Sequence, residues 1–173
     1  MKNILAISGS LREGSSNHNI LQFLGKMMPS EINYTIYGGF RDIPAFDPEI
    51  DNNISPALVA DLRERLAQAD GIIICTPEYA FGVPGALKNA LDWTVSSGSF
   101  SGKPTALITA STGGENAHEA LIKILGAIDA KLSPETTVLI QFVRSKMNSD
   151  GIVTDRDTVQ KLKTLIEAFI NLL

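Results

Sequence analysis

Residues 71–95 read GIIICTPEYAFGVPGALKNALDWTV, in which a short apolar run, a loop and a helical segment follow one another. Gly71 to Cys75 is almost wholly apolar and β-branched, which is typical of a central parallel strand covered on both faces. The segment from Thr76 to Pro84 is rich in proline and glycine, and the segment from Gly85 to Val95 is predicted to be helical. A buried strand that runs through a loop into a helix indicates an α/β fold.

The chain repeats this alternation on both sides of that segment. Apolar or β-branched runs predict further strands at Lys2–Ile7, Glu31–Tyr37, Thr105–Ala110 and Val138–Val143. The helical spacing of apolar residues predicts further helices at Ser16–Met28, from Pro56 onward, at Ala117–Ala130 and at Asp155–Leu173. In the helix from Pro56, Ser55 is the expected N-cap, and the expected buried stripe is Leu58, Leu62 and Leu66. The order βαβαβαβαβα implies a parallel sheet with right-handed crossovers and helices on both faces.

Length, charge and cysteine content narrow the class of protein. The 173 residues suit a single domain spanning residues 1–173, with a core of its own. The net charge of −4 at pH 7 offers no overall attraction for nucleic acid or for an anionic membrane. No apolar run approaches the ~18 residues that suggest a membrane-spanning helix. The one cysteine, Cys75, has no partner for an internal disulfide, so the expected location is the cytoplasm.

Function is expected where the strands end. In a parallel α/β sheet the binding crevice is built from loops at the carboxyl ends of the strands, at the point where the strand order reverses. Three predicted loops lie at that edge: the first loop (Ser8–Asn17), the second loop (Thr76–Pro84) and the third loop (Ala110–Asn116).

The first loop, SGSLREGSSN, has the residues of an anion site. Its glycines let backbone N–H groups converge at the start of a helix, where the partial positive charge favours an anion. Neutral donors and one full positive charge, which together suit a phosphate monoester, come from Ser10, Arg12, Ser15, Ser16 and Asn17. The alternative is an ordinary strand-to-helix turn in which a serine caps the helix and Arg12 is solvated.

Two common nucleotide-binding patterns do not fit this loop. Gly9 and Gly14 have the spacing G-x-x-x-x-G, but Ser15-Ser16 stand where a P-loop requires Lys followed by Ser or Thr. Without that lysine a triphosphate loses its charge partner, which argues against an NTPase. The pattern G-x-G-x-x-G fails as well, because Ser8-Gly9-Ser10 lacks its second glycine.

The second loop is predicted to form a rigid wall beside a flat ring such as a flavin. Its prolines stiffen the chain, and Gly82 permits close approach of the backbone. Tyr79 or Phe81 can stack on or flank such a ring. In the helix that follows, Lys88 and Asp92 are expected to pair, and Trp93 is expected to serve packing or a subunit contact.

These motifs resemble the NADPH-dependent FMN reductase family, a flavodoxin-like group of quinone-, azo- and chromate-reducing enzymes. The resemblance lies in GSLREGSSN at residues 9–17, in Pro77-Glu78-Tyr79 with PGALKNALDW at residues 84–93, and in DIPAFD at residues 42–47. It implies a flavodoxin-like three-layer sandwich with a five-stranded parallel sheet in the order 2-1-3-4-5. Members commonly form dimers or tetramers, which implies a homodimer or homotetramer here.

The resemblance also implies roles for the first and second loops in binding FMN. Ser10, Arg12, Ser15 and Asn17 would hold the phosphate, with Ser16 beside them. The isoalloxazine would be lined by Pro77, Glu78, Tyr79, Ala80 and Gly82, where many members carry Asn in place of Ala80. The third loop is less similar to the family, but its chemistry suits the same ligand: Ser111 would donate to the ribityl chain, and the glycine pair Gly113 and Gly114 would let backbone amides approach the ring.

The implied activity is that of an FMN-dependent NAD(P)H oxidoreductase. NADPH or NADH would reduce the flavin and leave, and a small acceptor (a quinone, a flavin, an azo compound or a metal oxyanion) would then take the electrons. No catalytic side chain is expected, because the cofactor performs the hydride transfer. The alternatives are a flavodoxin-like electron carrier without nicotinamide turnover, and a nucleotide-binding regulatory domain.

Several reactive side chains are expected to serve structure. Cys75 lies inside an apolar strand and is expected to be a buried small hydrophobic residue. His18 and His118 have no Cys or acidic cluster in ligand spacing, so no metal site is predicted. Glu78 is expected to lie at the ring edge or to have a structural role, since flavin hydride transfer needs no general acid there.

Overall fold

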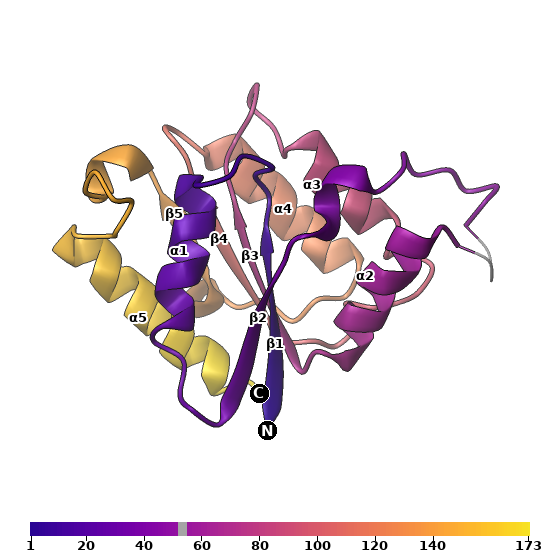
Figure 1. The fold of residues 1–173 in the computed structure, drawn as a ribbon, viewed down its shortest axis with the longest axis horizontal. Helices are drawn as coiled ribbons and strands as arrows, with labels where there is room; N and C mark the ends of the chain where they lie inside the picture. Colours follow the sequence, from indigo (N-terminus) through magenta and orange to yellow (C-terminus); the bar gives the residue numbers. More distant parts are fainter. Residues whose placement is uncertain (52–54) are drawn as a thin grey trace.

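The fold is described from a computed structural model of the chain, for residues 1–51 and 55–173 (Figure 1). The strands are β1 (Lys2–Ser8), β2 (Ile32–Tyr37), β3 (Gly71–Thr76), β4 (Thr105–Ala110) and β5 (Thr137–Ile140). The α-helices are α1 (Ser16–Gly25), α2 (Ala57–Gln68), α3 (Gly85–Asp92), α4 (Glu115–Ala127) and α5 (Arg156–Ile170). Short 3₁₀ turns are η1 (Gly39–Asp42), η2 (Pro134–Thr136) and η3 (Val143–Lys146).

The strands form one parallel sheet in the order β2-β1-β3-β4-β5, as expected. Ile4 of β1 pairs with Tyr34 of β2 on one side and with Gly71 of β3 on the other. All six residues of β3 are buried, and so are all six of β4. The order reverses between β1 and β3, so the crevice of a doubly wound fold lies above these two strands.

Helices cover both faces of the sheet, which makes three layers (Figure 1). Alternate residues of β3 point to opposite sides: Ile72 and Ile74 pack against α2, α3 and α4, whereas Ile73 and Cys75 pack against α1 and α5. Burial on both faces explains why β3 and β4 are apolar without a polar alternation.

The second helix begins later than predicted, and its buried face is different. The helix α2 begins at Ala57 with Pro56 as N-cap, so the prediction that Ser55 caps it was wrong. The Ser55 hydroxyl instead accepts a hydrogen bond from Arg63 at 2.8 Å, which draws it away from the helix end. Val59, Leu62 and Leu66 form the buried stripe, whereas Leu58 is exposed, so the prediction was right for Leu62 and Leu66 and wrong for Leu58.

Other element ends also differ from the predicted ones. The first helix stops at Gly25, where a β-carbon would lie 2.9 Å from the ring of Tyr34. The helix α3 ends at Asp92 rather than Val95. The helix α4 ends at Ala127 rather than Ala130, because Asp129 adopts a left-handed φ of 59°. The strand β5 ends at Ile140 rather than Val143, because Phe142 has a φ of 50° and turns the chain into η3.

The last helix, α5, starts after an Asp155 N-cap and ends at Ile170 rather than Leu173. Within residues 1–51 and 55–173, no helix has both the length and the apolar character that crossing a membrane requires.

Candidate cofactor site at the strand ends

The first and second loops lie against each other at the carboxyl edge of the sheet. The Gly9 N–H donates to the Cys75 carbonyl at 2.8 Å, which fixes the start of the first loop beside the end of β3. A β-carbon on Gly9 would lie 2.2 Å from the Thr76 hydroxyl oxygen, so only glycine allows this approach. The same edge carries the third loop after β4, at the top of the molecule in Figure 1.

The first loop folds into the turn that its glycine and serines predict. Gly14 has a φ of 60°, and the Ser15 N–H donates to the Arg12 carbonyl at 3.2 Å. Ser15 is the N-cap of α1, and its Oγ accepts from the His18 N–H at 3.2 Å. Its hydroxyl proton therefore remains available to donate to an anion at the helix start.

Asn17 is buried beneath this turn and is oriented by a cysteine. The Cys75 thiol donates to Asn17 Oδ1 at 3.4 Å, and both side chains are buried. Burial raises the pKa of the Cys75 thiol, so it stays protonated and able to donate. Cys75 is thus a small buried residue, as predicted, and it also holds a polar neighbour in place.

Arg12 extends from the same loop and is exposed. Within the part of the chain that the structure describes, no hydrogen bond or ion pair holds its guanidinium. Its backbone N–H donates to Ser10 Oγ at 3.3 Å, so the side chain starts beside the serine hydroxyl. An unpaired guanidinium beside serine hydroxyls and a helix start has the donor chemistry of a phosphate site.

The second loop forms a tight hairpin in an unusual backbone conformation. Tyr79 and Gly82 exchange two backbone hydrogen bonds of 3.0 Å, and the residues between them, Ala80 and Phe81, have φ of 48° and 59°. Two consecutive left-handed residues define a type I′ turn, in which Asn and Gly are the favoured residues. The turn leaves Phe81 with 81% of its surface exposed.

One side-chain contact joins this hairpin to the first loop. The hydroxyls of Ser10 and Tyr79 lie 3.4 Å apart. The predicted phosphate-binding residue and the predicted ring-binding residue are therefore neighbours.

Glu78 connects the second loop to the third. Its carboxylate accepts from the N–H groups of Gly114 at 3.3 Å and of Ala117 at 2.9 Å, and its own N–H donates to Ser111 Oγ at 3.3 Å. It thus occupies the start of α4, for which Gly114 supplies no side-chain cap. This contact agrees with the structural role that was one of the two expected for Glu78.

The third loop lies close to its neighbours because of its glycines. Gly114 has a φ of 116°, and a β-carbon there would lie 2.8 Å from the Leu139 side chain. The Gly114 N–H is bound by Glu78, so of the three residues predicted to face the ligand in this loop, Gly113 and Ser111 keep a donor for it.

His118 lies below the third loop and has a structural contact. Its Nδ1 is 2.9 Å from the Thr109 hydroxyl, and burial lowers the pKa of the imidazole. Among the described residues, no group of three or more His, Cys, Asp or Glu lies close enough to hold a metal ion.

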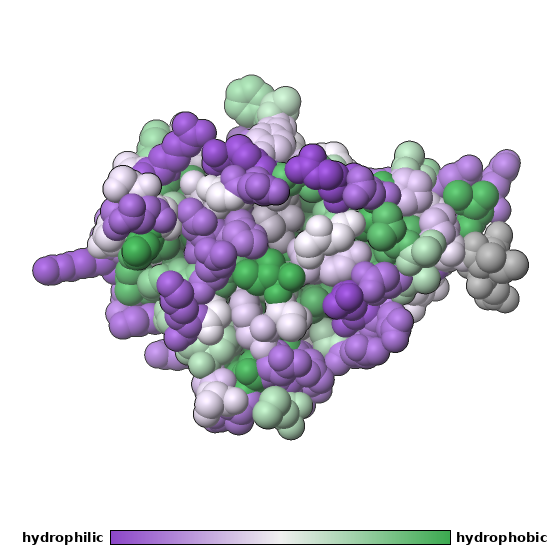
Figure 2. Space-filling view, viewed as in Figure 1, coloured by the Kyte–Doolittle hydropathy of each residue, from purple (hydrophilic) through white to green (hydrophobic). Residues whose placement is uncertain are grey.

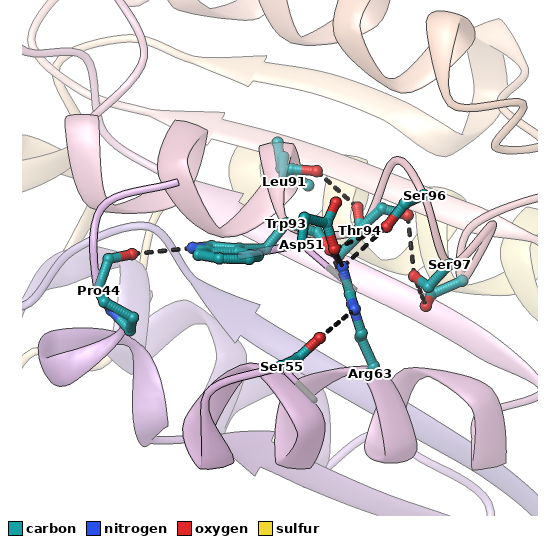
Figure 3. Close-up of polar contacts among 10 residues, drawn as sticks. Pro44, Asp51, Ser55, Arg63, Leu91, Trp93, Thr94, Ser96 and Ser97 are labelled. Carbon is teal, nitrogen blue, oxygen red and sulfur yellow. Dashed lines mark hydrogen bonds and ion pairs between the residues drawn. The ribbon is translucent and has the colours of Figure 1, made fainter. Parts of the chain in front are cut away.

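Segment 42–47 is attached to α3 by residues of the second motif (Figure 3). The Trp93 ring is fully buried, and its Nε1–H donates to the Pro44 carbonyl at 2.8 Å, so Trp93 serves packing. The Asn89 side chain bonds the Phe46 N–H at 2.7 Å and the Pro44 carbonyl at 2.8 Å. The predicted pair of Lys88 and Asp92 is confirmed, at 2.6 Å.

Arg63 holds the end of the connection that leads from segment 42–47 to α2, as Figure 3 shows. It contacts the Asp51 carboxylate at 2.6 Å, the Ser55 hydroxyl at 2.8 Å and the carbonyl of Trp93. The bond to Asp51 holds the pKa of that carboxyl below its ordinary value.

Sequence reasoning missed two arginines near the first loop. Arg41 donates to the Leu11 carbonyl at 2.8 Å, and a pocket of about 300 Å³ lies between the first loop and the residues after β2. Arg144, from η3, shares a second pocket with Arg12. Neither belongs to a local motif, so no signal in the sequence indicated them.

The described residues fit an FMN molecule in kind and arrangement. The first loop offers hydroxyl donors, a helix start and an exposed guanidinium for a dianionic monoester. The second loop adds an exposed aromatic side chain 3.4 Å from that donor set, and the third adds the Ser111 hydroxyl and a glycine backbone.

Comparison with known proteins agrees with this fit. The family model described as NADPH-dependent FMN reductase matches residues 2–144. A quinone reductase of Escherichia coli is 33% identical over 173 residues, which cover 96% of this chain and 92% of the relative. An NAD(P)H-dependent FMN reductase of Pseudomonas aeruginosa is 29% identical and covers 95% of this chain and 91% of its own length.

Solved structures show the same fold. The flavoenzyme FerB of Paracoccus denitrificans, an NAD(P)H:(acceptor) oxidoreductase, superposes with a TM-score of 0.80 at 28% identity, over 99% of this chain and 97% of its own.

Proposed function

The chain belongs to the NADPH-dependent FMN reductase family, and on that premise we propose that it is an FMN-dependent NAD(P)H oxidoreductase that passes electrons to a small acceptor. The observation that carries the proposal is the junction of the first two loops. There the Ser10 hydroxyl, beside the exposed Arg12, lies 3.4 Å from the Tyr79 hydroxyl. A ligand that carries both a phosphate group and a flat ring requires hydrogen-bond donors and an aromatic side chain that lie close together, as they do here.

The first loop would bind the phosphate of FMN. Hydroxyls of Ser10, Ser15 and Ser16 would donate to its oxygens, and Arg12 would supply the full charge. Asn17, held by the Cys75 thiol, would present its amide from below. The start of α1 adds a favourable field for the dianion.

The second and third loops would orient the ring and limit its contact with water. Pro77, Tyr79, Ala80 and Gly82 would lie along the ring, with Glu78 holding the two loops together. Ser111 would donate to the ribityl chain, and Gly113 and Gly114 would allow the backbone to approach.

FMN, when bound, supplies the acceptance and donation of hydride. No side chain of the site is therefore required as an acid or base at the hydride step. NADPH or NADH is the expected donor, and quinones are the favoured acceptors, with flavins, azo compounds and metal oxyanions as further candidates.

We also propose that the protein acts as a single domain in the cytoplasm and assembles as a homodimer or homotetramer. The exposed Phe81 supports an assembly, because a large apolar side chain at a projecting tip is a typical contact residue. Figure 2 shows an apolar group that projects from the top of the molecule.

The experiment that tests the function follows the flavin absorbance of the FMN-loaded protein without oxygen. NADPH is expected to bleach the flavin band, and a quinone to restore it. Steady-state rates with NADPH and a quinone are expected to give parallel reciprocal plots.

Each contrary result removes a defined part of the proposal. A flavin band unchanged by NADPH and NADH would indicate an electron carrier. Intersecting reciprocal plots would reject the two-step exchange. If the purified protein is colourless and FMN does not change its thermal stability, the proposed FMN site is wrong.

A further inference from the structure

The connection between β5 and α5 forms one wall of a pocket against the first loop. The pocket has a volume of about 400 Å³. Its first wall comes from the first loop and α1, and its second wall from η3 and the turn at residues 148–151. The lining includes Arg12, Ser16, Asn19, Arg144, Asp150 and Gly151.

The second wall is fixed in place by backbone contacts with the third loop. The Phe142 N–H donates to the Thr112 carbonyl at 3.1 Å, and the Val143 N–H donates to the Ser111 carbonyl at 3.0 Å. The left-handed Phe142 turns the chain at this point, so that Arg144 lies in the η3 turn directly after it.

The far end of the same wall lies directly on α1. A β-carbon on Gly151, which has a φ of 74°, would lie 2.0 Å from the Asn19 side chain. Because both ends are fastened, Arg144 has a defined place opposite Arg12.

The charge of the pocket lining is mainly positive. In the described ranges, no hydrogen bond or ion pair holds the guanidinium of Arg12 or of Arg144. Asp150 is the carboxylate in the lining, so the pocket has two positive charges against one negative charge. Lys146 also belongs to η3, but its Nζ lies 3.5 Å from Oδ2 of Asp155, with which it forms an ion pair.

We propose that this pocket binds a phosphate monoester and that Arg144 is one of its binding residues. A planar guanidinium binds two phosphate oxygens at once, and Ser16 at the start of α1 adds a hydroxyl in a favourable field. A dianion needs about two positive charges, and Arg12 alone supplies one.

The proposal rests on the proposed function, which brings two phosphate monoesters to this protein. One is the 5′-phosphate of FMN, since Arg12 and Ser16 belong to both the pocket and the predicted FMN site. The other is the 2′-phosphate of NADPH, which NADH lacks. Each has a matched ligand without the monoester, so the two sources can be distinguished.

The test compares Arg144→Gln with Arg156→Gln, which removes the same charge from the exposed first turn of α5, outside the pocket. Dissociation constants are measured for FMN and for riboflavin, and kcat/KM for NADPH and for NADH at saturating FMN. Arg144→Gln is expected to weaken one phosphorylated ligand about tenfold and to leave its unphosphorylated counterpart unchanged. Arg144→Lys is expected to bind the same phosphorylated ligand with an affinity between those of the wild-type protein and Arg144→Gln.

The pattern of losses identifies the source of the phosphate. A loss for FMN but not riboflavin assigns the flavin phosphate, and a loss for NADPH but not NADH assigns the 2′-phosphate. Equal effects on both members of each pair, or effects matched by Arg156→Gln, would overturn the proposal.

A further arm keeps this test separate from the proposed function. Inorganic phosphate, compared with chloride at equal ionic strength, is expected to raise the melting temperature of the wild-type protein more than that of Arg144→Gln. If the protein neither binds FMN nor oxidises NADPH, the proposed function fails. The phosphate pocket is then tested by the change in melting temperature alone. An equal change in the wild-type protein and in Arg144→Gln would reject the proposal that Arg144 binds phosphate.

Discussion

Ala80 and Phe81 hold the hairpin of the second loop in a conformation that L-residues with a β-carbon disfavour. Their φ of 48° and 59° cost about 1 kcal/mol per residue compared with ordinary conformations. The two backbone bonds between Tyr79 and Gly82 hold the turn in spite of this cost. The resemblance noted above places Asn at position 80 in many relatives, which has a direct reason in this geometry, because Asn tolerates the left-handed region.

Ala80→Asn is expected to raise the free energy of unfolding by up to about 1 kcal/mol, because it relieves this strain. The control is Ala60→Asn on the exposed face of α2, which is expected to lower it by about 0.5 kcal/mol through helix propensity. Urea denaturation measures both. Destabilisation by Ala80→Asn would show that the turn is not strained.

Gly9→Ala is expected to destabilise the protein by about 1–3 kcal/mol, because the new methyl would lie 2.2 Å from the Thr76 hydroxyl oxygen. Affinity for FMN is expected to fall as well, since the first and second loops must separate. Gly85→Ala is the control, for no atom lies within 4 Å of its β-carbon position and it begins α3. A Gly9→Ala protein as stable as Gly85→Ala would contradict the close approach of the loops.

At the level of elements, Arg63 joins three separate segments. From α2 it reaches Asp51 before that helix, Ser55 at its start and the Trp93 carbonyl at the end of α3. Only 16% of its side chain and 8% of that of Asp51 are exposed, so the pair is well shielded from water. The connection that carries Pro44 and Phe46 is therefore anchored at both ends.

Arg63→Ala is expected to lower the free energy of unfolding by about 2–3 kcal/mol, since it leaves a shielded carboxylate and a carbonyl without their partner. Arg65→Ala is the matched control on the same helix. Arg65 pairs with Asp61 on the exposed surface, where water screens the interaction, so its loss is expected to cost much less than the loss of Arg63. Equal effects of the two changes in urea denaturation would contradict the anchoring role of Arg63.

The same pair predicts a dependence on pH. The Arg63 hydrogen bond lowers the pKa of Asp51, so the stabilisation is present above the ordinary carboxyl pKa of about 3.9 and is lost as the pH falls through the lowered value. Asp51→Asn is therefore expected to be less stable than wild type at pH 7, with a difference that narrows below about pH 4. Urea denaturation between pH 7 and pH 3 measures this, with Asp61→Asn as control. A constant difference would exclude the ion pair as its cause.

At the largest scale, the three loops belong to one edge of one sheet, so a ligand that touches all of them stabilises the protein as a unit. FMN at one hundred times its dissociation constant is expected to add about 2.7 kcal/mol to the free energy of unfolding. Amide hydrogen exchange is expected to slow in the first, second and third loops together. Riboflavin at the same concentration is expected to stabilise less, because it lacks the phosphate. Protection confined to one loop would contradict a site shared by all three.

Much of the architecture followed from local patterns. The bounds of β4 were predicted to the residue, and β1 and β3 to within one residue, because burial of all of β3 and β4, and of β1 from Ile4 onward, makes these segments mostly apolar. The strand order was implied by the resemblance, since periodicity says which residues are buried but not which strands are neighbours.

The ends of elements were less predictable, because they depend on single residues in rare conformations. Asp129 ends α4 and Phe142 precedes η3 in the left-handed region, where glycine would be the usual signal. Ser55 has the composition of a helix cap, but Arg63, eight residues away along the chain, takes its hydroxyl.

The predicted donors of the first loop are contiguous, so their chemistry could be read from residues 8–17 alone. Folding supplied the partners that lie far away along the chain: Cys75 for Asn17, the start of α4 for Glu78, and Arg144 opposite Arg12. Local periodicity and turn chemistry act over a few residues, whereas parallel strands bring together loops that are separated by whole βα units. For that reason the donor set could be predicted from the sequence, whereas the residues that contact it were revealed only by the tertiary structure.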